Sequence, residues 1–494
     1  MRGPPDYRPL RARWRRRLGA VGAAVAALVF GSGCGVSHET TPACHVVRVA
    51  PTRQVDLLLM VDNSGSMAEE QASLTVQFPR LLRALTKGDL DADGVADFAP
   101  VEDLHLGVIT SDLGNGGFPV PTCATTFGDD GILITRGNVA TAGCLTTYPP
   151  FLTFTPGADV DSVATDFACV GRVGTGGCGF EQPLEAVLKA VTPSTSPTRF
   201  LMGSTGHADR ENAGFLREDS IVAVMVMSDE DDCSVADPAL FDPSSTHYTG
   251  DLNLRCFMHP EAVHPVSRFV DGLRAVRPGR PELLVFAAIT GIPYRLVADG
   301  TPAGYATVLS DPRMQEQIDS GAMMTRLTPS CNVPGRGLAF PPRRIVQVAE
   351  ALAPRSMVHS ICQEDFSGAI DALVAKIADA LGGTCLARPL TPSTDGSVAC
   401  DVREIVPAGA HCDPAAGRTF LRASRPEHGE PDGRDVCSVA QASRAAGTGW
   451  YYDDSATATA LCGPARPRIA FTSDALPAAG SELQLDCADE MCGG

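Results

Sequence analysis

The stretch 55–67 constrains the fold of this chain more than any other. Residues 55–61 form an almost unbroken apolar run, which ends abruptly in Asp62, Ser64 and Ser66. A strand without polar alternation has to be covered on both faces, which predicts the centre of a parallel sheet with helices on each side. In such sheets, ligands bind in the crevice beyond the carboxyl ends of the strands.

The three polar residues that follow this strand predict a metal site. The spacing of Asp62, Ser64 and Ser66 lets a tight turn aim one carboxylate and two hydroxyl oxygens at a common point, with Gly65 relaxing the backbone between them. Ligation by oxygen alone selects Mg²⁺, Mn²⁺ or Ca²⁺ over zinc. The alternative is a helix start at which Ser64 or Ser66 acts only as an N-cap.

This pattern resembles the metal-ion-dependent adhesion site of von Willebrand factor A (vWA) domains. A second apolar strand at 221–227 ends in Ser228 and Asp229, where the family places an aspartate of its third metal loop. The resemblance implies that Asp62, Ser64 and Ser66 contact a cation directly and that Asp229 acts through water. It also implies a threonine in a Gly-rich turn before a helix, and Thr175 is the hydroxyl available there.

Strand and helix patterns alternate through the first two thirds of the chain. We expect strands at 55–61, 104–110, 221–227, 283–289 and 357–361, and helices at 67–87, from the Gly-rich turn to 191, and at 263–276, 343–352 and 366–381. Pro79 should kink or split the first helix. This alternation predicts a doubly wound α/β domain with a mostly parallel sheet.

The domain organisation follows from changes in composition. We expect a signal peptide at 1–33, a tether at 34–52, a vWA-like domain at 53–382 with insertions at 113–170 and 234–260, and a cysteine-rich region at 383–494. The last region has few long apolar runs and many Pro and Gly, which is typical of a small β-rich module held by disulfides.

The first residues have the layout of an export signal. Seven arginines precede an apolar run at 18–30 that is too short to span a bilayer, and small residues then precede Cys34. This arrangement resembles a bacterial lipobox, which implies a lipid anchor on Cys34 and an outer-membrane lipoprotein. Simple signal cleavage with a free Cys34 is the alternative.

The charge of the chain argues against one class of partner. Removing residues 1–33, which contain seven Arg and one Asp, moves the formal net charge from −18 to −24. We therefore expect no nucleic-acid partner.

The 17 cysteines fit an exported, oxidised protein. If Cys34 is acylated, 16 cysteines remain, which is an even number. The sequence contains no C-x-x-C pair, so the spacing typical of a zinc site is missing. Eight lie inside the vWA-like domain and can close among themselves, namely Cys123, Cys144, Cys169, Cys178, Cys233, Cys256, Cys331 and Cys362, with Cys233 and Cys256 stapling the second insertion. The C-terminal region holds an odd seven, so one of them needs Cys44. Some A domains are closed by a disulfide between the cysteines that flank them, and this resemblance implies a bond between Cys44 and Cys385. Cys400 is the rival partner of Cys385.

Two acidic runs are further candidates. Asp89, Asp91, Asp93 and Asp97 alternate around a Gly-permitted turn and can wrap a Ca²⁺ ion, although Pro100 stands where an EF-hand has glutamate. The alternative is a solvated acidic turn. The extra acids at 230–232 either bind a second ion or are solvated, and we expect the latter.

No catalytic signature appears, so we expect no enzyme. His259 and His264 are five residues apart with Pro260 between them, and no Gly-x-Ser-x-Gly elbow is present. Two function classes remain. One is a binding module whose cation is bound by an acidic residue of a protein or matrix ligand, and the other is a structural scaffold whose metal is capped from within.

Overall fold

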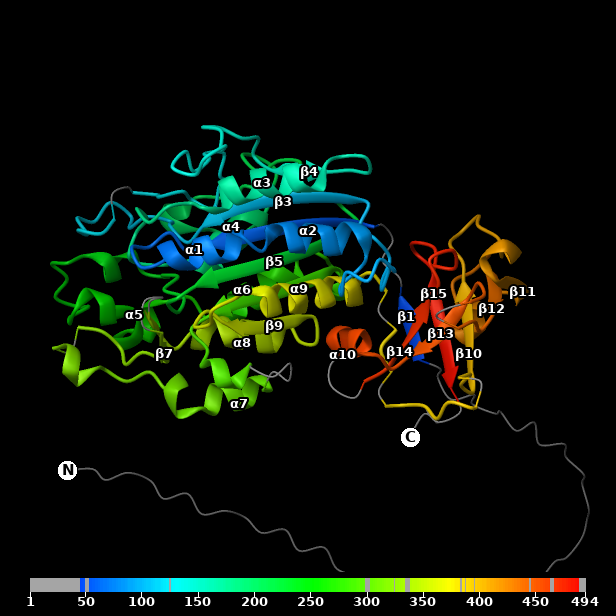
Figure 1. Ribbon diagram of the computed structural model, residues 1–494. Coiled ribbons are helices and arrows are strands. Elements are labelled where there is room, and N and C mark those ends of the chain that lie inside the picture. Colours follow the sequence, from blue (N-terminus) through cyan, green and yellow to red (C-terminus); the bar gives the residue numbers. More distant parts are fainter. Residues whose placement is uncertain are drawn as a thin grey trace, which may run out of the picture. The chain divides into compact units, whose positions relative to one another are not determined.

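The computed structural model describes residues 45–48, 53–123, 126–297, 303–323, 325–333, 338–382, 384–386, 388–394, 396–443, 446–462 and 466–487 (Figure 1). The proposed signal peptide, Cys34 and Cys44 lie outside these residues. No helix within these ranges is both long and apolar enough to cross a membrane.

A six-stranded mixed sheet forms the core of the first domain. Its strand order is β4-β3-β2-β5-β6-β9, and every neighbouring pair is parallel except β3 and β4, which are antiparallel. The strands are β2 (Gln54–Val61), β3 (Asp103–Thr110), β4 (Leu152–Phe154), β5 (Ile221–Ser228), β6 (Leu284–Thr290) and β9 (Ser356–Ser360). The chain builds outward in one direction from β2 and in the other from β5, so the strand order reverses between these two central strands.

Helices cover both faces of this sheet, as the apolar runs require. One face packs on α1 (Ala68–Thr75), α2 (Phe78–Lys87), α3 (Val160–Gly171) and α9 (Ser367–Ala380), and the other on α4 (Pro183–Val191), α6 (Val266–Arg274) and α8 (Arg343–Ala351). Alternate residues of β2 point to the two faces of the sheet. Leu57 and Leu59 pack in the apolar cluster on the face covered by α1, α2, α3 and α9, and Leu58 and Met60 pack in the cluster on the other face. Full burial of each such side chain contributes roughly 1.5–3 kcal/mol.

The one charged residue inside β2 is Asp56, and nearby polar side chains compensate its buried charge. Asp56 is fully buried, and its carboxylate accepts hydrogen bonds from Arg217 Nε at 2.8 Å and Ser220 Oγ at 2.5 Å. Arg217 Nη2 also lies 2.6 Å from this carboxylate. Because a buried charge is tolerated only when paired and hydrogen-bonded, this cluster allows an acid within the central strand.

The elements expected from the sequence are present, with ends shifted by a few residues. The expected helix at 67–87 is split into α1 and α2, and Pro79 lies in the first turn of α2, where a missing N–H is harmless. The insertion expected at 113–170 is smaller than we predicted. Its last part forms β4 and α3, and Phe167 of α3 stacks on Phe78 with ring centroids 4.3 Å apart.

The cysteine-rich region is β-rich, as expected. Its five-stranded antiparallel sheet has the order β1-β15-β10-β12-β11, and β13 pairs with β14. The strands are β1 (His45–Arg48), β10 (Cys400–Ile405), β11 (Arg418–Ala423), β12 (Asp435–Val439), β13 (Trp450–Asp453), β14 (Arg468–Phe471) and β15 (Glu482–Cys487). Strand β1 comes from the segment 34–52, so this tether also provides an edge strand of the C-terminal sheet. Shorter elements are α5 (Arg255–Met258), α7 (Tyr305–Ser310), α10 (Ala456–Cys462) and the pair β7 (Cys331–Asn332) and β8 (Leu338–Ala339).

Seven disulfides lie within the described residues. The eight cysteines of the first domain close among themselves as predicted, in the pairs Cys123–Cys178, Cys144–Cys169, Cys233–Cys256 and Cys331–Cys362. The others are Cys385–Cys462, Cys400–Cys487 and Cys412–Cys437.

The expected bridge from Cys44 to Cys385 is wrong. Cys385 bonds Cys462 at the end of α10, and Cys400 faces Cys487 in the register of β10 and β15. The sheet register that brings Cys400 to Cys487, and the position of α10, could not be read from cysteine spacing alone. The odd seventh cysteine of this region is Cys492, which lies outside the described residues.

A histidine with two carboxylate partners ties the first insertion to the domain. Nδ1 of His207 lies 2.6 Å from Glu211 Oε2, and Nε2 lies 2.9 Å from Asp130 Oδ2. Asp130 also pairs with Lys189, which is fully buried in α4. Two carboxylate partners require an N–H on both ring nitrogens, which only the imidazolium has. Burial lowers the pKa of His207, but the hydrogen bonds to Asp130 and Glu211 outweigh it, so the pKa is raised above 6.5.

This cluster predicts a pH-dependent contribution to stability. A raised histidine pKa stabilises the fold fully below about pH 6.5, and the contribution is lost as the pH rises through the higher pKa of the folded state. The melting temperature of the wild type should therefore exceed that of His207→Gln most at pH 6 and least at pH 9. Melting curves of both proteins across this range measure the difference, and a constant gap would contradict the assignment of an imidazolium.

Candidate metal centre

The carboxyl ends of β2 and β5 meet where the strand order of the sheet reverses. Val61 faces Met227 in the parallel register, and the N–H of Asp62 donates to the carbonyl of Met227 at 2.9 Å. The turn after β2 and the turn after β5 therefore begin side by side. In open α/β sheets, this crevice is the position at which ligands bind.

The carboxylate of Asp62 is buried at the centre of this crevice. Its Oδ1 accepts the N–H of Ser64 at 2.8 Å and the hydroxyl of Ser111 at 3.3 Å, and its Oδ2 accepts the hydroxyl of Ser228 at 2.7 Å. Burial raises the pKa of Asp62 above its usual range, and these hydrogen bonds offset part of the rise. Ser111 directly follows β3 and Ser228 ends β5, so residues at three neighbouring strand ends hold this one side chain.

The other predicted residues of the motif join the same group. The hydroxyls of Ser64 and Ser66 lie 3.3 Å apart. Burial raises the pKa of Asp229 well above its usual range, and the side chain of Ser66 offsets part of the rise. Asp229 is 2% exposed, and its Oδ1 is buried without a hydrogen-bond partner among the described residues. Hydrogen bonds thus connect Asp62, Ser64 and Ser66, and Asp229 follows β5, whose end lies beside that of β2.

Thr175 stands apart from these four. Its turn contacts the motif, because Gln71 Nε2 donates to the carbonyls of both Asp62 and Gly174 at 2.9 Å. The side chain of Thr175 is nevertheless exposed. Among the described residues, no hydrogen bond joins it to Asp62, Ser64, Ser66 or Asp229, so the geometry does not bring this candidate into the group.

Two further acids act on the centre: Glu230 belongs to the acidic run after β5, and Glu181 was not singled out by the sequence analysis. Glu181 is 3% exposed. Burial, together with the charges of Glu230 and Asp62, raises the pKa of Glu181 well above its usual range. Burial and the charge of Asp62 raise the pKa of Glu230 to about 7. The one sequence signal for Glu181 was its place at the end of a Gly-rich turn before a helix.

These carboxyl groups lack a positive partner. No Lys, Arg or His in the described parts of the chain pairs with Asp62, Glu181, Asp229 or Glu230. Glu70 of α1 adds a fifth acid, whose pKa burial raises to about 7 and whose Oε2 is buried without a partner. Buried acids stay ionised only when a cation or hydrogen bonds compensate them. Orphaned oxygens and an oxygen-only donor set therefore fit a hard divalent cation.

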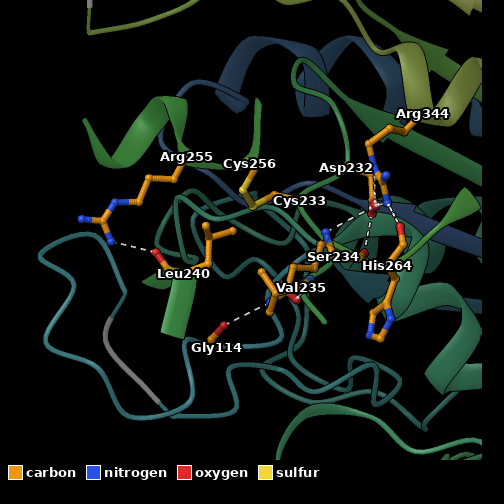
Figure 2. Close-up of a disulfide and its surroundings, with 11 residues drawn as sticks. Gly114, Asp232, Cys233, Ser234, Val235, Leu240, Arg255, Cys256, His264 and Arg344 are labelled. Carbon is orange, nitrogen blue, oxygen red and sulfur yellow. Dashed lines mark hydrogen bonds and ion pairs between the residues drawn. A yellow bond between two sulfur atoms is a disulfide. The ribbon is translucent and has the colours of Figure 1, made fainter. Parts of the chain in front are cut away.

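The rest of the acidic run after β5 has a structural role, so our expectation that it is solvated is wrong. Asp231 accepts the backbone N–H groups of Arg344 and Ile345 at the start of α8, and Asp232 accepts the N–H of Leu184 at the start of α4. Figure 2 shows the side chain of Arg344 reaching Asp232, at 3.1 Å. Carboxylates stabilise helix N-termini because they satisfy free N–H groups and oppose the helix dipole.

Two disulfides fix the loops that carry these acids. Cys178 lies in the Gly-rich turn and bonds Cys123, whereas Cys233 follows the acidic run and bonds Cys256 (Figure 2). The four cysteines share one apolar cluster, in which the rings of Phe180 and Phe241 lie 4.4 Å apart. The two insertions therefore pack together over the loops that flank the centre.

The acidic loop after α2 is a separate candidate. Asp89, Asp91 and Asp97 each place a carboxylate oxygen within 4.8 Å of the others. Asp93 is not part of this convergence, and its side chain accepts the N–H of Val95. Asp97 is buried and also contacts Arg468 Nη2 at 3.4 Å, while Asp89 Oδ1 is buried without a hydrogen-bond partner.

Comparison with known proteins leaves the family open. No protein-family model and no curated protein matches the chain. Among solved structures, proximal thread matrix protein 1 of the mussel byssus is 12% identical over 69% of this chain and 51% of its own, with a TM-score of 0.24. The human COPII-coat protein Sec24c is 8% identical over 88% of this chain and 43% of its own, with a TM-score of 0.27. The chain thus spans about half the length of each or less, and both TM-scores are low.

Proposed function

We propose that this chain is a lipid-anchored binding protein of the cell envelope, built on a doubly wound domain of the vWA type. In this proposal, Asp62, Ser64, Ser66 and Asp229 hold a divalent cation that a protein or matrix ligand binds through an acidic residue. The observation that carries it is the hydrogen-bonded group of Asp62, Ser64 and Ser66 at the reversal of strand order, where Asp229 follows the neighbouring strand with its Oδ1 buried and unpartnered.

The residues of the proposed site have different roles. Asp62 supplies charge and is held in one orientation by Ser111 and Ser228, so little ordering is needed when a cation binds. Ser66 is exposed, which places its hydroxyl on the side open to a partner. Mg²⁺, Mn²⁺ or Ca²⁺ would supply a coordination position for the carboxylate of the ligand.

A structural scaffold is the second candidate function, because the same crevice contains surplus acids that could cap a cation from within. The two functions differ in access of solvent to the cation. With Mn²⁺ as the probe, a binding module should show fast relaxation of water protons that falls when an acidic peptide is added. A capped centre should show slow relaxation and no response to the peptide.

The metal assignment predicts that Asp62→Ala weakens Mn²⁺ binding by more than about 100-fold, since even indirect supporting residues of metal sites are worth 10–100-fold. Isothermal calorimetry measures this change, and circular dichroism checks that the fold is kept. Asp454→Ala removes one exposed acid from the C-terminal region and should bind Mn²⁺ like the wild type. Unchanged affinity in Asp62→Ala would reject the centre.

The proposed anchor predicts the location of a variant in the cell. Cys34→Ser removes the thiol that lipidation requires, so the protein should move from the outer-membrane fraction to the soluble fraction. Fractionation followed by immunoblotting measures this change. Retention of Cys34→Ser in the membrane would place the anchor elsewhere.

A calcium ion at the acidic loop is a second proposed site. It is favoured by the convergence of Asp89, Asp91 and Asp97, and by the orphaned Oδ1 of Asp89. Thr457 of α10 donates its hydroxyl to Asp91 at 2.6 Å, and Arg468 of β14 contacts Asp97. A cation here would therefore join a loop of the α/β domain to two elements of the cysteine-rich region.

This site predicts a calcium-dependent melting temperature. A ligand bound only by the native state stabilises it, by about 2.7 kcal/mol at 100 times the dissociation constant. The double variant Asp89→Asn and Asp91→Asn should lose the increase in melting temperature that Ca²⁺ causes. Asp93→Asn, outside the convergent group, should keep it. Equal shifts in all three proteins would leave a solvated turn as the better interpretation.

A further inference from the structure

The last strand of the six-stranded sheet has an open edge. Strand β9 is outermost and pairs only with β6 (Figure 1). The N–H of Phe286 in β6 donates to the carbonyl of Arg355, which directly precedes β9. Because the backbone groups of successive strand residues point to opposite sides, Ser356 and Val358 turn their N–H and C=O groups away from β6.

The backbone groups at this edge are buried. Ser356 is 4% exposed and Val358 is 5% exposed. Within the described parts of the chain, no hydrogen bond pairs the outward N–H or C=O of Val358. Buried backbone groups in folded proteins are almost always paired. The edge of β9 therefore fits a partner that both donates to and accepts from a strand backbone.

A cavity of about 1170 Å³ borders the same edge, and its lining includes Ser356, Met357, Val358 and His359. An extended residue inside a covered sheet takes about 160 Å³, from a rise of about 3.3 Å, a strand spacing of about 4.8 Å and a layer of about 10 Å. A strand as long as β9, which has five residues, would need about 800 Å³. The cavity is therefore large enough for such a strand.

Helices cover the cavity on both faces of the sheet. Ala372 of α9 packs against the apolar cluster that contains Met357, and Tyr305 of α7 packs against the cluster that contains Val358. Both side chains line the cavity, and the hydroxyl of Tyr305 lies 2.7 Å from that of Ser356. A strand in this position would be covered on both faces, which favours apolar side chains in both directions.

His359 adds a side-chain donor to the cavity. It is 8% exposed, and its Nδ1 accepts the N–H of Ser360 at 3.1 Å. Burial lowers the pKa of His359, so at pH 7 the ring is neutral and carries its proton on Nε2. No residue in the described ranges accepts a hydrogen bond from Nε2, and His359 and Gly368 both line the cavity. An oxygen of an occupant beside Nε2 would satisfy this donor.

The charges that line the cavity indicate the chemistry of the occupant. Glu364, Asp365 and Asp371 outnumber Lys376 there. Asp371 is paired with Arg80, whereas Glu364 and Asp365 are exposed beyond the carboxyl end of β9. Complementary charges favour a partner with lysine or arginine at this end and disfavour an acidic one.

We propose that the open edge of β9 binds an extended segment of a partner protein, which adds to the sheet as a further strand. The backbone of the segment pairs with Val358, its apolar side chains fill the cavity, and a basic residue lies over Glu364 and Asp365. Binding of this kind takes affinity from the backbone and specificity from the side-chain pockets. The inference goes beyond the proposed function, because this edge needs no cation at Asp62.

Capped synthetic peptides provide the probe. In each, valine alternates with threonine or isoleucine and the last two residues are lysine. Fluorescence polarisation with the purified protein should show saturable binding, equal in EDTA and in Mn²⁺. Replacing the lysines by glutamate should weaken binding about two- to fivefold. Failure of every peptide to bind would overturn the proposal.

N-methylation of the peptides tests the backbone pairing. Alternate backbone nitrogens can be methylated in two phases, and only one edge of an added strand faces β9. One phase should therefore weaken binding more than about tenfold, and the other less than about threefold. Equal binding by the two methylated forms would show that side chains alone are recognised, and would overturn strand addition.

Two variants at one position test the edge from the side of the protein. Val358→Pro removes the N–H that β6 does not use, whereas Val358→Ala keeps it. We expect Val358→Pro to lose more than about tenfold in peptide affinity and Val358→Ala less than about threefold. Equal losses would overturn the proposal. If melting curves show that Val358→Pro does not fold, the methylated peptides decide the question on the wild type. A wild-type dimer in sedimentation that Val358→Pro dissociates would assign the edge to a second copy and overturn a separate partner.

Discussion

One carboxylate is buried at the junction of the two half-sheets, and the polar residues at the ends of three strands are arranged around it. Asp62 lies where β2 and β5 end side by side, and strands on both sides of the junction supply hydroxyls to it. A buried acid is stable only with such donors or with a cation. The apolar strands thus bury Asp62, and the hydroxyls at their ends compensate the cost of burying its charge.

The sequence predicted the central part of this architecture because its signals are local. An unbroken apolar strand, a turn of small polar residues and a following helix can all be recognised within a dozen residues. The sheet, the split of the first helix at Pro79 and the closure of eight cysteines in the first domain followed from such signals. The vWA form of the domain, the cation and the ligand stay proposals.

The parts that could not be predicted depend on contacts between distant segments. Glu181 and Glu230 are 49 positions apart, and no local pattern shows that the charge of one raises the pKa of the other. The sequence predicted solvated acids at 231 and 232, because these residues cap helices that lie far away in the sequence. Such capping leaves no spacing to recognise. The pairing of Cys385 with Cys462 follows from the position of α10, and Cys400 with Cys487 from sheet register. Each of these is a property of the assembled fold.

The disulfides beside the centre have a consequence for how the protein matures. Cys123–Cys178 and Cys233–Cys256 join the two loops that carry Glu181 and Asp229 to the insertions packed above them. While the thiols are reduced, as in the cytosol, nothing covalent holds these loops together, and the acids of the crevice repel one another. If the proposed export and the proposed metal site both hold, oxidation after export would bring the loops together first, and the cation would bind second. The oxidising compartment would then delay metal binding until after export.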